Sequence, residues 1–253
     1  MGVQTAQAML REKGVSNDEQ VVIYGNWANQ GAWSVGFFIV RSSLSILFVC
    51  SLAHHRLSCV YCRGEEGRLF WMLEYLNHTK VSVLYGGIDA YNRPSPNGLG
   101  LDLESNWNSP AAAGDFVAFE RVELRATREE IHAAVTLNLC NAVFFDTRTE
   151  AEYDGSRSMY GAERDGHIPN AKWYPWQQVF DDDGGNLKSS QELRAELLTY
   201  GVTDSSMIVA YCTGGIRSGF LYLVLRWAGF PTPQNYDGSW WEWSQNVYAM
   251  PIE

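Results

Sequence analysis

Short apolar runs alternate with amphipathic segments along this chain. The run MIVAYC (207–212) is apolar throughout, which is typical of a central strand in a parallel sheet. The segments AQAMLREK (6–13) and SSQELRAELLTY (189–200) have helical periodicity instead, and the second opens with serine at a predicted N-cap. Because helices and strands alternate, the pattern predicts parallel α/β units.

The same pattern occurs twice. The stretch GVSNDEQVVIYGN, starting at Gly14, matches GVTDSSMIVAYCT, starting at Gly201. Further along, the apolar helices RLFWMLEYLNH (68–78) and FLYLVLRWAGF (220–230) also match. A repeat this long excludes a solenoid and favours tandem domains. We therefore predict an α/β fold with two tandem domains, each a parallel sheet flanked by helices.

Three ranges follow from the repeat. Residues 1–91 are predicted to form a first domain, 92–114 a linker rich in Pro, Gly, Ser and Asn, and 115–253 a second, complete domain. The first copy has no counterpart of AVFFDTR or GHIPNA, so about half of that domain is expected to be missing. Its residue opposite Cys212 is Gly25, which leaves the thiol to the second copy.

Composition and charge restrict the function. Apolar residues make up 46% of the 253, enough for a sizeable core, and the net charge of −10 argues against a nucleic-acid partner. Five cysteines, few and odd in number, fit a reducing compartment better than a disulfide framework. No apolar signal-peptide core follows Met1, so we expect a soluble intracellular protein without a membrane partner.

The stretch YCTGGIRSGF (211–220) carries the candidate chemistry. Cys212 follows a predicted strand, and two glycines and Arg217 lead into a helix. Glycines allow backbone N–H groups to converge on an anion, and the helix N-terminus adds about half a positive charge. A thiol there is expected to have a lowered pKa, whereas Cys140 is interpreted as a small buried hydrophobe. Arg217 adds a fixed charge and a bidentate fork.

This loop resembles the active-site loop of the rhodanese family of sulfurtransferases, which has the form Cys-x-x-Gly-x-Arg-Ser. AVFFDTRTEAEYDG (142–155) resembles the family's first strand and Asp-x-Arg turn. GHIPNAKWYPW (166–176) is similar to its Gly-His-Ile-Pro-Gly-Ala segment, with Asn170 in place of glycine. YDGSWWEW (236–243) resembles the C-terminal signature of tandem-domain thiosulfate and 3-mercaptopyruvate sulfurtransferases. The first copy resembles their non-catalytic N-terminal domain.

The resemblance implies sulfur transfer without a cofactor or a metal. Cys212 is expected to take a sulfane sulfur from thiosulfate or 3-mercaptopyruvate as a persulfide and to pass it to cyanide or a thiol. A thioredoxin-like reductant is a further candidate partner. Arg164 matches a substrate-anion arginine of the mercaptopyruvate branch, and Arg157 is a looser candidate. The residues expected to form the loop and bind the donor are Thr213, Gly214, Gly215, Ile216, Arg217, Ser218, Arg164 and Arg157.

Other residues of the matching segments have expected roles as well. Arg217 either binds the donor or braces the loop through a carboxylate. Asp146 and Arg148 are expected to fix the sheet end, His167 to close its turn, and Tyr236–Gly238 to form a turn beside the site. The loop has small residues early and one arginine, so it matches neither branch fully; thiosulfate is the preferred donor.

Two other classes of function stay open. A rhodanese-related, cysteine-dependent phosphatase would carry five residues between cysteine and arginine to enclose phosphate, whereas this chain carries four, Thr213–Ile216. A non-catalytic sulfur-relay or binding module is the other alternative, and the presence of both Cys212 and Arg217 argues against it.

A 30-residue insert, 34–63, interrupts the first domain. Its stretch VGFFIVRSSLSILFVCSLA is just long enough to span a membrane, but Arg41 near its centre is costly there. Four other residues of the insert could bind a metal, but two adjacent histidines and one CxxC pair form a weak metal-binding signature. They are His54, His55, Cys59 and Cys62. The preferred interpretation is a disordered loop or translated non-coding sequence.

Overall fold

The computed structural model describes residues 2–24, 36–41, 45–49, 64–85, 112–181 and 186–253. The chain divides into two compact units, Met1–Arg121 and Val122–Glu253. The division lies after Arg121 and therefore beyond the predicted domain start at residue 115. The reason is that the segment leading up to Arg121 is hydrogen-bonded to the first unit. The Gly114 amide donates to the carbonyl of Arg11, and the Arg121 amide to that of Tyr75. Most of the predicted linker lies outside the described residues.

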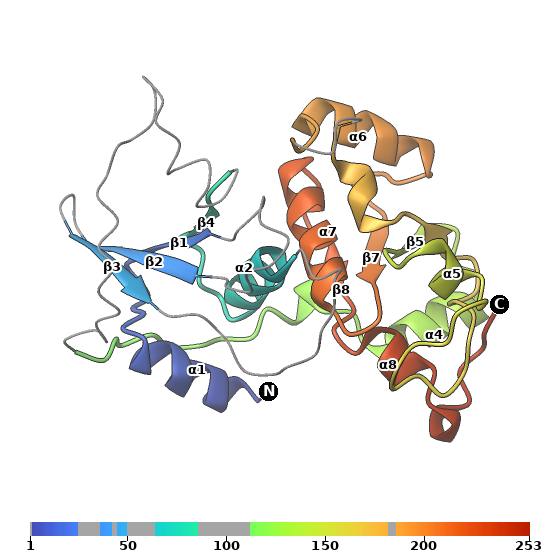
Figure 1. Cartoon of the computed structure of the whole chain (residues 1–253), viewed down its shortest axis with the longest axis horizontal. Helices are drawn as coiled ribbons and strands as arrows, with labels where there is room; N and C mark the ends of the chain where they lie inside the picture. The colour runs from blue at the N-terminus through green and yellow to red at the C-terminus, as the bar shows by residue number, and fades with distance from the viewer. Residues whose placement is uncertain (1, 25–35, 42–44, 50–63, 86–111, 182–185) are drawn as a thin grey trace. The chain divides into compact units, whose positions relative to one another are not determined.

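The first unit contains a four-stranded sheet in the order β3-β2-β1-β4 (Figure 1). Its elements are α1 (Val3–Glu12), β1 (Gln20–Tyr24), β2 (Gly36–Arg41), β3 (Ser45–Val49), α2 (Glu65–Tyr75) and β4 (Val81–Val83). β1 pairs in parallel with β4, as the α/β prediction requires. It pairs antiparallel with β2, however, so this sheet is mixed where a parallel one was predicted.

The insert explains the mixed sheet. β2 and β3 both come from it, and they pair antiparallel with each other. The hypothesis of a disordered loop is therefore wrong for 36–41 and 45–49. The physical reason is that their runs, GFFIV and SILFV, are rich in strand-forming residues and extend an open edge of β1. Within the described residues, no helix is long and apolar enough to cross a bilayer.

The core of the first unit forms between α2 and the sheet. Val21 and Ile23 of β1 are fully buried, and α2 buries Leu69, Trp71 and Leu73. Leu69 and Leu73 lie four residues apart and share one face of α2, as expected for an apolar face, whereas Trp71 points to the opposite side of the helix. Burial of this face holds the helix, because short helices gain most of their stability from tertiary packing.

The second unit contains a wholly parallel sheet in the order β6-β5-β7-β8. Its strands β5, β7 and β8 are labelled in Figure 1. Its strands are β5 (Ala142–Asp146), β6 (Lys172–Trp173), β7 (Met207–Tyr211) and β8 (Gln234–Asn235). Its α-helices are α4 (Arg128–Thr136), α5 (Glu150–Tyr153), α6 (Ser190–Thr199), α7 (Ile216–Trp227) and α8 (Ser239–Trp243). Short 3-10 helices lie at Val122–Leu124, Trp176–Val179 and Asn246–Tyr248. This unit has the predicted architecture.

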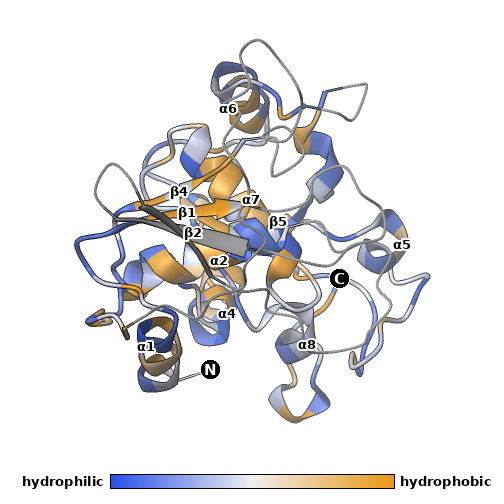
Figure 2. Ribbon diagram, turned by 60° about the vertical axis from the view of Figure 1, so that its left-hand side comes forward, coloured by the Kyte–Doolittle hydropathy of each residue, from blue (hydrophilic) through white to orange (hydrophobic). Residues whose placement is uncertain are grey.

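Sequence signals set these elements. α4 and α6 each begin with a capping box, in which Thr127 and Ser189 exchange hydrogen bonds with a glutamate three residues later. β5 and β7 bury their last four residues, because central parallel strands are covered on both faces. α7 is mostly hydrophobic in Figure 2, and seven of its residues are buried. The thiol loop therefore joins two core elements.

Candidate active site

Cys212 lies at the carboxyl end of β7, where parallel α/β sheets place their sites. The strand ends at Tyr211, and α7 begins four residues after the thiol. Gly215 turns the chain into this helix with a φ of 84°, a left-handed conformation that glycine adopts at low cost. The thiol itself is 1% exposed. Its environment is therefore set by the loop that surrounds it.

Several donors of the loop converge on the sulfur. The Gly215 amide donates to Cys212 Sγ at 3.1 Å, and the Ser218 hydroxyl lies 3.6 Å from it. Burial opposes ionisation, but the charge of Arg217 and hydrogen bonds from Ser218 and the Gly214 amide together hold the pKa of the thiol below its ordinary value. The expected anion nest therefore stabilises a thiolate.

Arg217 forms an ion pair with Glu152 of α5. Its Nη1 donates to Oε2 at 2.9 Å and its Nη2 to Oε1 at 2.8 Å, a bidentate arrangement. The Thr213 hydroxyl joins the pair by donating to Glu152 at 2.8 Å and accepting from Arg217. Of the two roles considered for Arg217, the geometry supports bracing the loop through a carboxylate.

The pair perturbs the pKa values of both partners. Burial would raise the pKa of Glu152, but hydrogen bonding to Arg217, its charge, and bonds from Thr149 lower it to about 2. Burial would likewise lower the pKa of Arg217, but Glu152 and the nearby thiolate raise it. Both groups are therefore charged at neutral pH.

The first turn of α8 fastens the loop from another side. The Cys212 amide donates to the Ser239 hydroxyl at 3.1 Å, and that hydroxyl donates to the Tyr236 carbonyl at 2.7 Å. The amides of Trp240 and Trp241 donate to the carbonyls of Cys212 and Thr213 at 2.9 and 3.0 Å. The turn expected at Tyr236–Gly238 thus lies beside the site.

Asp146 and Arg148 hold the end of β5. Both are fully buried, and the Arg148 guanidinium donates to both carboxylate oxygens and to the Gly166 carbonyl. The next residue, Thr147, donates its amide and hydroxyl to the Tyr211 carbonyl at the end of β7. This arrangement accords with the structural role expected for the two residues.

His167 lies in the turn where it was expected. Its amide and carbonyl pair with the backbone of Glu253, and its ring stacks on Tyr153 at a centroid distance of 3.8 Å. Its Nδ1 lies 2.9 Å from the Tyr153 carbonyl. These contacts hold the turn and the C-terminal segment together.

Arg164 and Arg157 are not drawn into the thiol loop. The Arg164 guanidinium donates to the backbone carbonyls of Trp243, Ser244 and Met250 at 2.7–3.0 Å. These contacts use the fork to hold the segment after α8, so they do not support the predicted role in anion binding. Arg157 is exposed, and its amide is bonded to the Ala151 carbonyl.

Sequence reasoning missed three residues of the site: Glu152, Ser239 and Trp241. Glu152 lies in the segment EAEYDG that was matched to the family, but nothing in the pattern pointed to Arg217 as its partner. Ser239 and Trp241 lie in YDGSWWEW, where the tryptophans were interpreted as packing. The segment YDGSWWEW after the last strand was the sequence signal that could have identified these two residues.

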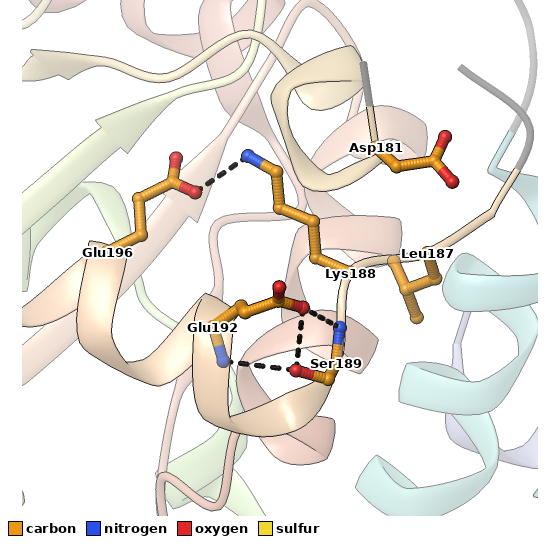
Figure 3. Close-up of a pocket in the computed structure, with 6 residues that line it drawn as sticks. All are labelled: Asp181, Leu187, Lys188, Ser189, Glu192 and Glu196. Atoms are coloured by element: carbon orange, nitrogen blue, oxygen red, sulfur yellow. Dashed lines mark hydrogen bonds and ion pairs between the residues drawn. The ribbon is translucent and has the colours of Figure 1, made fainter. Parts of the chain in front are cut away.

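Other polar clusters lie away from the thiol. A pocket of about 470 Å³ is lined by Asp181, Leu187, Lys188, Ser189, Glu192 and Glu196 (Figure 3). Its polar groups satisfy one another, because Ser189 and Glu192 form the capping box and Lys188 pairs with Glu196 at 2.8 Å. No group of three metal-binding side chains occurs in the described part of the chain, and the candidates at 54–62 lie outside it.

The chain is similar to known proteins. A model of the rhodanese-like domain matches residues 129–246. A thiosulfate sulfurtransferase from Azotobacter vinelandii is 30% identical over 206 residues, which cover 79% of this chain and 71% of that protein. The sulfur carrier protein TtuD from Thermus thermophilus is 28% identical over 252 residues, covering 96% of this chain and 74% of that protein.

Solved structures share the fold. An anaerobic ergothioneine biosynthesis enzyme from Chlorobium limicola, in complex with trimethyl histidine, superposes with a TM-score of 0.74 at 19% identity. The superposition covers the whole of this chain and 55% of that one, so the chain spans about half the length of this neighbour. Together with the loop around Cys212 and the match to the Azotobacter enzyme, these findings place the chain in the rhodanese family of sulfurtransferases.

Proposed function

We propose that this chain moves a sulfane sulfur from a small donor to an acceptor through a persulfide on Cys212. The thiolate attacks the outer sulfur of thiosulfate, a sulfur–sulfur bond forms, and the bond inside the donor breaks as sulfite leaves with its electron pair. Cyanide or a thiolate then attacks the outer sulfur of the persulfide and regenerates the Cys212 thiolate. 3-Mercaptopyruvate is the alternative donor.

A single observation carries the proposal: N–H and hydroxyl donors converge on a buried thiol whose pKa they lower. The Gly215 amide and the Ser218 hydroxyl face Sγ, and the nearby charge of Arg217 favours the anion. Such preorganised donors stabilise both the attacking thiolate and the persulfide anion that replaces it. We infer that they, rather than the Glu152-bound fork of Arg217, stabilise the transferred sulfur.

A sulfur carrier is the second candidate, favoured by the similarity to the sulfur carrier protein TtuD of Thermus thermophilus. In that role the same persulfide would pass to a thiol of a partner protein, such as a thioredoxin-like reductant, and not to a small acceptor. The chemistry at Cys212 is shared, so the acceptor distinguishes the two candidates. We place the protein in a reducing compartment because a free Cys212 thiol is required.

Sulfur transfer to cyanide tests the proposal. The purified chain is incubated with thiosulfate or 3-mercaptopyruvate plus cyanide, and the thiocyanate formed is measured. Mass spectrometry of the Cys212 peptide then shows whether it carries one additional sulfur atom. We expect thiocyanate with at least one donor, no turnover by Cys212→Ser, and parental turnover by Cys140→Ser. The prediction that Cys140 is buried is wrong, because its thiol is exposed, which makes it a suitable control.

Two other outcomes are informative. Hydrolysis of an aryl phosphate without thiocyanate formation would contradict the proposal and support the phosphatase alternative. Persulfide formation on Cys212 without transfer to cyanide, but with transfer to a dithiol protein, would support the carrier instead.

A further inference from the structure

Gly214, in the thiol loop, is a glycine for reasons of space. Its φ lies outside the left-handed region, so backbone conformation does not require glycine there. A Cβ at this position would lie 2.4 Å from Cζ3 and 2.6 Å from Cε3 of Trp241. Such distances are shorter than any ordinary carbon contact. The indole therefore occupies the place of a side chain at residue 214.

The indole is fixed there from two directions. Nε1 of Trp241 donates to the Tyr160 carbonyl at 2.7 Å, and its backbone amide donates to the Thr213 carbonyl. A Cβ at Gly161 would lie 3.1 Å from Nε1, so a second glycine gives the ring its room. The side chain is nevertheless 44% exposed. An indole held rigidly with much of its surface in solvent is suited to contact a ligand.

Positive charge on the side chains of the loop is limited to one residue. From Cys212 to Ser218 the sequence carries a single basic residue, Arg217, and both of its terminal nitrogens are bonded to Glu152. Residue 214 precedes the amide that donates to the thiol, so a cation there would lie close to the reacting sulfur. Trp241 prevents such a cation by occupying its space.

We propose that Trp241 is a specificity-determining residue. Its uncharged indole occupies the space that a side chain at residue 214 would fill, in the loop that carries Cys212. The proposal rests on the proposed sulfur transfer. Sulfur donors are then selected by how well their non-reacting atoms pack against the indole, and backbone N–H groups stabilise their negative charge. A cation introduced at 214 with the indole removed therefore favours the dianion thiosulfate over the monoanion 3-mercaptopyruvate.

The steric part is tested by rescue. Gly214→Ala alone is expected to lower sulfur transfer to cyanide several-fold, because the methyl group collides with the indole and displaces the loop. Gly214→Ala combined with Trp241→Ala is expected to recover the rate of Trp241→Ala alone. Trp227→Ala, which removes another exposed tryptophan, is the matched control and keeps parental transfer.

The charge part is tested by Gly214→Lys in the Trp241→Ala background. We expect the KM for thiosulfate to fall about tenfold relative to Trp241→Ala, with a smaller change for 3-mercaptopyruvate and a new dependence on salt. Alkylation of the Cys212 peptide by anionic iodoacetate, relative to neutral iodoacetamide, is expected to rise in parallel. Thermal unfolding of each variant shows whether it is folded.

Three results would overturn the inference: a Gly214→Ala variant that matches the parent, a double variant that is not rescued, or an added lysine that leaves the alkylation ratio unchanged. The alkylation ratio does not depend on sulfur transfer. If the parent forms neither a Cys212 persulfide nor thiocyanate from either donor, the proposed function fails, while the alkylation ratio still tests the role of Trp241.

Discussion

Glu152 and Arg217 form the residue-scale support of the thiol loop. Glu152 is 3% exposed, and its carboxylate binds both the Arg217 fork and the Thr213 hydroxyl. Removing one partner of a buried pair leaves the other charge without compensation, which typically costs about 3–5 kcal/mol. The conformation of the loop therefore depends on both partners of the pair being charged.

This pair makes stability depend on acid pH. The pKa of Glu152 is lowered from 4.5 to about 2 in the folded chain, so its contribution is fully present above pH 4.5 and is lost as the pH falls through 2. Such a shift corresponds to roughly 3 kcal/mol. We expect Glu152→Gln to lower the free energy of unfolding by a similar amount at pH 7 and to flatten its fall between these pH values, as measured by denaturant titration.

Glu150→Gln is the matched control, since Glu150 lies exposed on the same helix. It should keep the stability and acid dependence of the parent. A Glu152→Gln variant whose unfolding follows the parental pH curve would contradict the assignment of this dependence to the pair.

The decisive element is the junction between β7 and α7. It begins with the thiol and ends with Gly215, whose left-handed conformation directs its amide at the sulfur. The strand fixes where the thiol emerges, and the helix contributes the positive end of its dipole. The junction thus lowers the pKa of a buried thiol and favours its thiolate form.

Gly215→Ala tests this junction. An L-residue in the left-handed region costs roughly 1–2 kcal/mol, and relief of that strain would turn the amide away from Sγ. We therefore expect lower stability and also a higher thiol pKa, seen as an alkylation rate that rises only at higher pH. Gly201→Ala is the control, because Gly201 has the same φ of 84° and open space around a Cβ. Equal thiol reactivity in both variants would refute the role of the Gly215 amide.

The whole molecule consists of two units with separate cores. Each unit has its own sheet, and the sheet of the first unit includes two strands from the insert. Core damage in one unit should therefore be felt mainly within that unit.

Leu73→Ala tests this separation. Leu73 is 1% exposed in the first unit, and its truncation should cost about 2–5 kcal/mol there. We expect calorimetry to show a lower unfolding temperature for the first unit, while the alkylation rate of Cys212 at 25 °C stays unchanged. Leu221→Ala, in α7, should instead lower the second transition and disturb the thiol. A loss of thiol reactivity in Leu73→Ala would show that the units are energetically coupled.

The sequence by itself determined the architecture of the second unit and predicted Cys212 as its candidate nucleophile. The strand, loop and helix around Cys212 are contiguous in the chain, so local pattern and resemblance sufficed to predict them. The serine N-cap of α6 was also predicted from the sequence, because such a cap involves residues close together in the chain.

Only the tertiary structure decided what surrounds the thiol and how the insert is arranged. Glu152 reaches Arg217 across 65 residues and Ser239 reaches Cys212 across 27, and no local periodicity encodes such partners. The use of Gly214 as space for Trp241 is visible only once α8 has docked. The strands of the insert likewise depended on a neighbour, because β2 pairs with an edge of β1 that the sequence alone did not identify.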